Sequence, residues 1–165
     1  MPQGSPIRIL LAEDHTIVRQ GLRTLLEEYP NLAVVGEASN GEEAVFMAGK
    51  LQPAIVLMDI TMPKMDGITA TRLIKTNFPH IAVIGLTVNP YRYNIDAMHK
   101  AGASEVLSKE NAVGDLFAAI QRSVASIQPI LVLEDPSLSR EVALGRGQIN
   151  ESPAATVPMK ESSQT

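Results

Sequence analysis

The chain has 165 residues, which suits one domain of ordinary size followed by a short tail. Its formal net charge of −4 argues against a basic surface for nucleic acid, so we expect no direct DNA binding by this chain. It has no cysteine, no signal peptide at its start and no apolar run near the roughly 20 residues that span a bilayer. We therefore expect a cytoplasmic protein without a membrane contact.

Apolar strand patterns alternate with helix patterns along the chain. Strands are predicted over 7–12, 32–38, 54–58, 80–86 and 105–108, and helices over 15–29, 42–51, 68–77, 91–101 and 113–126. Five βα units imply an α/β fold, with a five-stranded parallel, doubly wound sheet covered by helices on both faces. The most apolar strand, 54–58, is predicted at the centre of the sheet.

Two helices carry clear apolar faces. The first predicted helix places five apolar residues on one stripe, and the last has three on its core face. These residues are Ile17, Val18, Leu22, Leu25 and Leu26 in the first helix, and Leu116, Phe117 and Ile120 in the last. Both faces are expected to pack against the sheet.

Acidic residues follow two of the predicted strands. Glu13 and Asp14 come directly after the strand 7–12, and Asp59 comes after the strand 54–58. In an open parallel sheet the carboxyl ends of the strands open onto one crevice, so these carboxylates should converge. They would repel one another unless a hard cation such as Mg²⁺ sat among them. The sequence therefore predicts a small acidic metal pocket.

A hydroxyl and an ammonium group follow two other strands. Thr87 comes after the strand 80–86 and Lys109 after the strand 105–108. Taken alone, Thr87 is an ordinary strand-end residue and Lys109 a solvated surface charge. An anionic group brought beside Asp59, however, would be held by the metal, the hydroxyl and the ammonium group. This combination is suited to phosphoryl transfer onto a carboxylate.

Four stretches of the chain resemble the receiver domain of two-component response regulators. They are "LAEDHTIVRQGLRTLL", "VVGEASNGEEAV", "DITMPKMDGI" and "AGASEVLSKE". The resemblance covers about residues 5–126, and its specificity comes from the four stretches occurring together in this order and spacing. They are most similar to the branch that usually carries a LuxR-type helix-turn-helix output domain.

The resemblance implies a signalling switch that phosphorylates and dephosphorylates itself and is not otherwise an enzyme. Asp59 resembles the aspartate that receives a phosphoryl group from a sensor histidine kinase or a phosphotransfer protein. Thr87 resembles the switch hydroxyl, and Lys109 the lysine that pairs with the phosphate.

The resemblance also implies Mg²⁺ as the cofactor. Glu13 and Asp14 resemble the acidic pair that binds the metal together with Asp59. The backbone carbonyl of Thr61, two residues after Asp59, is expected to be a further ligand.

The chain departs from the family at Val106, where a Tyr or Phe is usual. Valine has no ring to swing inward and its χ1 is stiff, so we expect weak coupling between phosphorylation and the output surface. The output would be an unknown downstream protein or a homodimer. The predicted surface comprises Tyr91, Tyr93, Met98, His99, Val106 and Ala118.

Three other function classes compete with this interpretation, and the residues at the site count against the first two. A haloacid-dehalogenase-type phosphohydrolase would need a second acid two residues after the nucleophile, where this chain has Thr61. A flavin-binding module on the same fold would need a phosphate loop after the first strand, where Glu13 and Asp14 would repel phosphate. A phosphorylation-independent interaction module is the third class, and Val106 keeps it open.

Three residues near the predicted site receive structural interpretations. Gly67 is expected to adopt a positive φ in a tight turn, and Asp66 to cap the helix that starts at Ile68. His15 is interpreted as a residue of the first helical turn without a catalytic or metal-binding role.

The composition of the chain changes after Gln128. We interpret 1–128 as the receiver domain and 129–146 as a segment that resembles the linker before a helix-turn-helix domain. Residues 147–165 are rich in Ser, Thr and Pro, lack aromatic residues and are predicted to be disordered. They are too few to form a DNA-binding domain, so we expect the chain to lack one.

Overall fold

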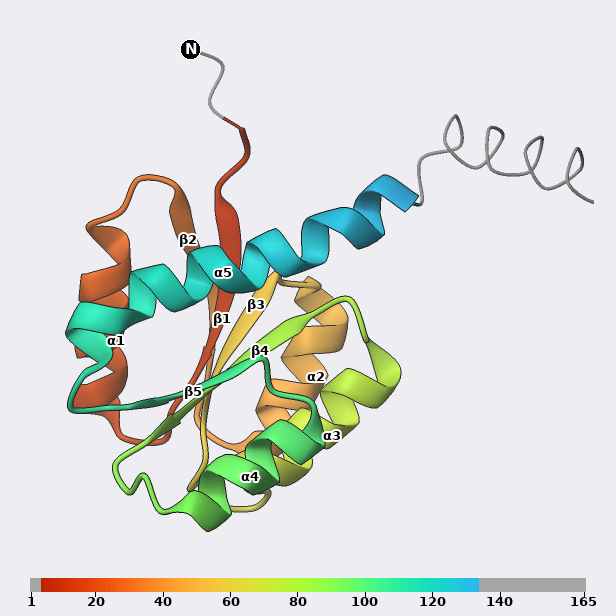
Figure 1. Ribbon diagram of the computed structural model, residues 1–165. Coiled ribbons are helices and arrows are strands. Elements are labelled where there is room, and N and C mark those ends of the chain that lie inside the picture. The colour runs from red at the N-terminus through yellow and green to blue at the C-terminus, as the bar shows by residue number, and fades with distance from the viewer. Residues whose placement is uncertain (1–3, 134–165) are drawn as a thin grey trace, which may run out of the picture. The chain divides into compact units, whose positions relative to one another are not determined.

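Five parallel strands form one sheet in the computed structural model, which describes residues 4–133. The strands are β1 (Ile7–Ala12), β2 (Leu32–Ala38), β3 (Ile55–Asp59), β4 (Ala82–Thr87) and β5 (Glu105–Ser108). The helices that follow them are α1 (Thr16–Glu27), α2 (Gly41–Leu51), α3 (Gly67–Asn77), α4 (Arg92–Ala101) and α5 (Ala112–Leu133). The strand order is β2-β1-β3-β4-β5 (Figure 1), so the predicted fold is confirmed, with β3 at the centre.

The helices cover both faces of the sheet (Figure 1). Successive side chains of β1 point to opposite faces, so Ile9 and Leu11 join one apolar cluster and Leu10 and Ala12 the other. The first cluster includes Leu22 and Leu26 of α1 and Leu116, Ala119 and Ile120 of α5. The second includes Ala44 and Ala48 of α2, Ala70 and Ile74 of α3, and Met98 of α4. Burial on both faces explains why these strands are almost continuously apolar.

The predicted apolar stripe of α1 is correct only for its later turns. Leu22 and Leu26 are buried, whereas Ile17 is 84% exposed and Val18 37% exposed. The prediction was wrong for these two residues because α1 begins beyond the carboxyl end of β1, so its first turn does not lie over the sheet. Val18 instead lines a pocket beside Asp59.

The loop between β3 and α3 turns differently from the prediction. Gly67 is not among the residues with positive φ, and Lys64 takes that conformation in this loop, with a φ of 67°. Glycine at 67 has another physical reason: a Cβ there would lie 2.0 Å from the carbonyl oxygen of Asp59. Asp66 caps α3 as predicted, since its side chain accepts a 2.7 Å hydrogen bond from the backbone N–H of Thr69.

The last described helix is longer than predicted. α5 ends at Leu133, so residues 129–133 of the predicted linker-like segment are helical. No helix within residues 4–133 is long and apolar enough to cross a membrane. The remainder of the linker-like segment and the predicted disordered tail, 147–165, lie outside the described residues.

Candidate functional site

The carboxyl ends of β1 and β3 bring the acidic residues together. The two strands pair in parallel with Ala12 beside Met58. The next residues in the strand direction, Glu13 after Ala12 and Asp59 after Met58, are therefore neighbours at the carboxyl end of the sheet. Glu13 is fully buried and Asp59 is 3% exposed. The strand order reverses between β1 and β3, and ligands of open α/β sheets bind at such switch points.

Lys109 joins the two buried acids. Its backbone N–H donates a 2.8 Å hydrogen bond to the carbonyl oxygen of Thr87, directly after β5. Its Nζ then lies 2.5 Å from Oε2 of Glu13 and 3.1 Å from Oδ1 of Asp59. Burying unpaired carboxylates is very costly, so this ammonium group makes the pair compatible with the protein interior.

The environment of Asp59 disfavours its charge. Burial raises the pKa of Asp59 to about 6, although the ammonium group of Lys109 acts in the opposite direction. The negative charge of Glu13 raises this pKa further, while a hydrogen bond from the backbone N–H of Thr61 lowers it. Asp59 is thus a carboxylate that a bound cation would stabilise.

Asp14 completes a set of oxygen atoms suited to a divalent cation. Its Oδ1 is buried without a hydrogen bond, although Nδ1 of His15 lies 3.3 Å away. Ligand atoms from Glu13, Asp14, His15 and Asp59 all lie within 4.8 Å of one another. Asp14 and Asp59 also line a pocket of about 690 Å³. Carboxylate oxygens in this arrangement fit Mg²⁺, which prefers oxygen ligands.

Thr87 ends β4 beside this pocket, but its hydroxyl is hydrogen-bonded to Asn89 and not to Asp59. The hydroxyl donates a 2.9 Å hydrogen bond to the carbonyl oxygen of Asn89 and accepts one of 3.0 Å from the backbone N–H of Asn89. In the sheet Leu86 stands opposite Asp59, so Thr87 lies one residue beyond it. The structure therefore brings Glu13, Asp14, Asp59 and Lys109 together, with Thr87 next to them and its hydroxyl bonded to Asn89.

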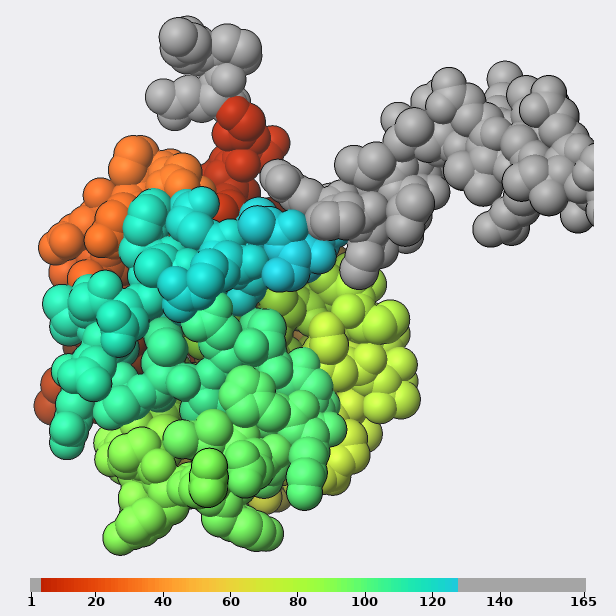
Figure 2. Space-filling view, viewed as in Figure 1, coloured from red at the N-terminus to blue at the C-terminus, as the bar shows by residue number. Residues whose placement is uncertain are grey.

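The expected output surface is formed by α4, β5 and α5, which make one continuous face in the space-filling view (Figure 2). Val106 is half-buried and stands opposite Gly85 of β4. Met98 is fully buried, and its Cε would lie 2.7 Å from a Cβ at Gly85, so placing Met98 on this surface was wrong. The other predicted surface residues, Tyr91, Tyr93, His99 and Ala118, are exposed.

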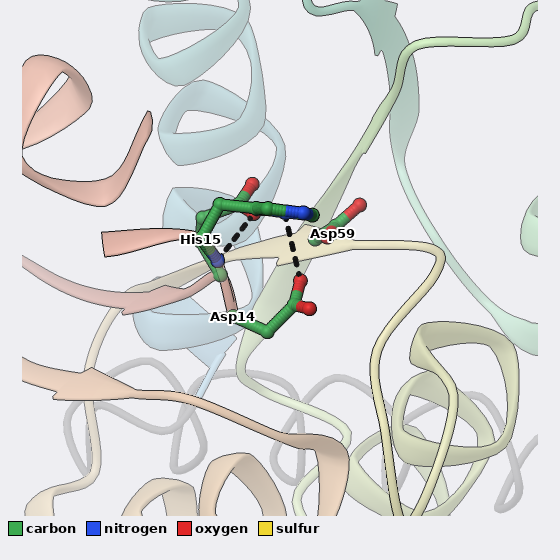
Figure 3. Close-up of side chains that lie close together, drawn as sticks. Asp14, His15 and Asp59 are labelled. Atoms are coloured by element: carbon green, nitrogen blue, oxygen red, sulfur yellow. Dashed lines mark hydrogen bonds and ion pairs between the residues drawn. The ribbon is translucent and has the colours of Figure 1, made fainter. Parts of the chain in front are cut away.

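Sequence reasoning missed the position of His15. Its Nδ1 lies 3.1 Å from Oε1 of Glu13 and 3.3 Å from Oδ1 of Asp14. Figure 3 shows the His15 ring beside the carboxylates of Asp14 and Asp59. His15 precedes α1 but makes no side-chain capping bond, and its Nδ1 instead shares a hydrogen bond with Oε1 of Glu13 in the pocket. The signal was the run Glu13-Asp14-His15, which places a metal-ligating imidazole next to two acids.

The fold and site define a class of protein, a doubly wound domain with a buried aspartate held between a lysine and an acidic pair. The family described as "Response regulator receiver domain" matches residues 9–121. The chain belongs to this family and contains the receiver domain of a two-component response regulator, as the sequence analysis predicted.

Relatives and solved structures agree with this assignment. The chain is 34% identical over 149 residues to "Response regulator GacA" of Pseudomonas viridiflava, which covers 89% of this chain and 68% of the relative. It is 37% identical over 154 residues to a "Protein-glutamate methylesterase/protein-glutamine glutaminase" of Alkalilimnicola ehrlichii, covering 92% of this chain and 36% of the relative. The crystal structure of a LuxR-family two-component response regulator from Aurantimonas sp. SI85-9A1 has a TM-score of 0.71 and 33% identity, covering 87% of this chain and 99% of the other. The chain thus spans only part of the length of these two curated relatives.

Proposed function

We propose that this receiver accepts a phosphoryl group on Asp59 from a sensor histidine kinase or a phosphotransfer protein. The observation that carries the proposal is the position of Asp59, which lines the pocket while its Oδ1 lies 3.1 Å from Nζ of Lys109. A phosphorylated imidazole suits this pocket as a donor because its leaving group, once protonated, is neutral and adds no further negative charge.

The transfer is a displacement at phosphorus. An oxygen of Asp59 attacks the phosphorus atom, the new O–P bond forms, and the N–P bond of the donor breaks. The leaving nitrogen keeps the electron pair and takes up a proton, and the product on Asp59 is an acyl phosphate. Attack of water on the phosphorus later releases inorganic phosphate and restores the carboxylate. Lys109 is already in place to hold a phosphoryl oxygen, so this stabilisation needs little reorganisation.

Mg²⁺, when bound, supplies positive charge to the carboxylates and to a phosphoryl oxygen. Glu13, Asp14, Asp59 and the backbone carbonyl of Thr61 are the proposed ligands. Both carboxylate oxygens of Glu13 already accept hydrogen bonds, one from Lys109 and the other from the backbone N–H of His15. Asp14 and Asp59 are therefore expected to contribute most of the metal affinity.

The proposed output begins with Thr87. A phosphoryl group on Asp59 would offer the hydroxyl of Thr87 a charged acceptor. This acceptor would compete with the two hydrogen bonds between Thr87 and Asn89. Exchange of these partners would move the segment between β4 and α4, and with it the face presented to an unknown downstream protein. Because Val106 has no ring, we expect this face to shift less than it would with an aromatic residue.

The experiment is incubation with a small phosphodonor and Mg²⁺, followed by intact-mass measurement. We expect the chain to gain one phosphate, and both Asp59→Asn and chelation of the metal to abolish the gain. Asp96→Asn is the matched control, since Asp96 is an exposed aspartate on α4. A phosphate gain that persists in Asp59→Asn would assign the modification to another residue and contradict the proposal.

Asp14→Ala should weaken Mg²⁺ binding at least about tenfold, because a hard cation with few protein ligands depends on each carboxylate. Titration calorimetry of the two proteins measures the difference, with Asp96→Ala as a control for the loss of one acidic charge. Equal Mg²⁺ affinity in the wild type and Asp14→Ala would mean that Asp14 is only a solvated loop residue.

The remaining partner and location assignments stay predictions. A homodimer, the absence of direct DNA binding and a cytoplasmic location rest on composition and on the family resemblance.

A further inference from the structure

The imidazole of His15 is spaced from the acidic oxygens as a ligand of a shared ion would be. Nδ1 lies 3.1 Å from Oε1 of Glu13, with which it shares a hydrogen bond, and 3.3 Å from Oδ1 of Asp14. Ligand atoms about 2.1 Å from one ion stand roughly 3.0 Å apart along the edge of an octahedron and about 3.4 Å apart along the edge of a tetrahedron, so an ion could replace the shared proton with little movement. Both distances fall in or close to this range, and a carboxylate oxygen of Asp59 lies within 4.8 Å of the same atoms.

In the metal-free site Nδ1 of His15 contacts both acids, so a bound ion would replace these contacts. Oδ1 of Asp14 is buried and has no hydrogen bond, only the imidazole of His15 at 3.3 Å, so a cation there would give this oxygen a direct partner. The side chain of His15 is 69% exposed and its ring lines the pocket, so it can adjust by a few tenths of an ångström without disturbing the core. Figure 3 shows its ring close to Asp14 and Asp59.

The donor set matters because metals differ in their preference for nitrogen. Mg²⁺ prefers oxygen ligands and loses its water reluctantly, whereas imidazole suits Zn²⁺, Ni²⁺ and Cu²⁺. The chain has no cysteine, and its three histidines are its only imidazole ligands. Within residues 4–133, His15 is the only histidine that belongs to a cluster of potential metal ligands.

We propose that His15 is an additional ligand of the acidic pocket, one that gives the site a preference for borderline transition-metal ions over Mg²⁺. Zn²⁺ is the representative of this class. Such an ion would be held by the imidazole of His15 with carboxylate oxygens of Asp14 and Asp59, and would compete with Mg²⁺ for the same place. The proposal concerns metal selectivity and does not depend on phosphoryl transfer.

The test compares Zn²⁺ and Mg²⁺ affinities of the full chain by titration calorimetry. We expect His15→Gln to lower the ratio of Zn²⁺ to Mg²⁺ affinity at least tenfold. His80→Gln and His99→Gln are matched controls, since both remove an exposed imidazole outside the acidic cluster, and they should leave the ratio within about twofold of the wild type. Asp14→Ala should weaken the binding of both metals.

A spectroscopic measurement separates ligation from an indirect effect. Pulsed electron paramagnetic resonance of the protein loaded with Cu²⁺ should show coupling to an imidazole nitrogen in the wild type and none in His15→Gln. An unchanged Zn²⁺ to Mg²⁺ ratio in His15→Gln overturns the proposal, as does Zn²⁺ affinity that Asp14→Ala leaves intact. Failure of Asp59 to gain phosphate would contradict the proposed function but leave these metal affinities unaffected.

Discussion

Gly67→Ala should destabilise the protein by roughly 3 kcal/mol or more, and the variant should fail to accept phosphate if it folds at all. A Cβ at 67 would lie 2.0 Å from the carbonyl oxygen of Asp59, and 2.9 Å from the Cα of Ile60. Both neighbours are backbone atoms, so neither can rotate away as a side chain would. Relief requires moving α3 away from the end of β3, which is the strand end that carries Asp59.

Chemical denaturation of the purified variant measures this effect. The matched control is Gly21→Ala, because Gly21 lies inside α1 with nothing within 4 Å of its ideal Cβ position. Alanine is the better helix former, so the control should gain up to about 1 kcal/mol. If Gly67→Ala had the same stability as the wild type, the contact between α3 and the end of β3 would not constrain this loop.

Asp59→Asn should stabilise the metal-free protein at neutral pH and lose this advantage in acid. Burial raises the pKa of Asp59 from 3.8 to about 6, so between these values the folded state binds the proton more strongly than the unfolded state. Stability attributable to Asp59 therefore falls as the pH rises from about 4 to 6, by up to about 3 kcal/mol. An asparagine has nearly the same shape and no charge, so it avoids this cost.

The comparison is made by denaturation in a chelator, at pH 7.5 and at pH 4.5. The variant should exceed the wild type in unfolding free energy at pH 7.5, and the difference should shrink markedly at pH 4.5. Asp96→Asn, on the exposed face of α4, should stay within about 0.5 kcal/mol of the wild type at both pH values. An advantage of Asp59→Asn that is equal at the two pH values would show that the charge of Asp59 carries no cost in the folded protein.

The sequence was sufficient for the fold because the order of apolar strands and helical repeats determines the βα units. It also indicated which strand ends carry acids, and β1 pairs with β3 so that Glu13 and Asp59 become neighbours. Periodicity failed for Ile17 and Val18, since it reports spacing within a helix but not where the helix begins relative to the sheet. Met98 of α4 was misplaced for a related reason. Its burial depends on the space beside Gly85 of β4, which the spacing within the helix does not report.

The site itself was less predictable at the level of side-chain orientation. The sequence predicted that Thr87 lies at a strand end. It did not predict the two hydrogen bonds that its hydroxyl makes with Asn89. Gly67 was expected to need a positive φ, whereas the observed constraint is the close approach of the Asp59 carbonyl oxygen. Such contacts between residues of different elements depend on tertiary packing that no local pattern contains.

Mapping the modified residue tests whether Asp59 is the phosphoryl acceptor. Borohydride reduces an acyl phosphate on an aspartate to the alcohol, which leaves homoserine at that position. After incubation with phosphodonor and Mg²⁺, reduction and proteolysis, tandem mass spectrometry should find homoserine at residue 59 and at no other aspartate. Homoserine at Asp14 or Asp66, or phosphate retained on a hydroxyl or histidine side chain with none at Asp59, would show that Asp59 is not the acceptor.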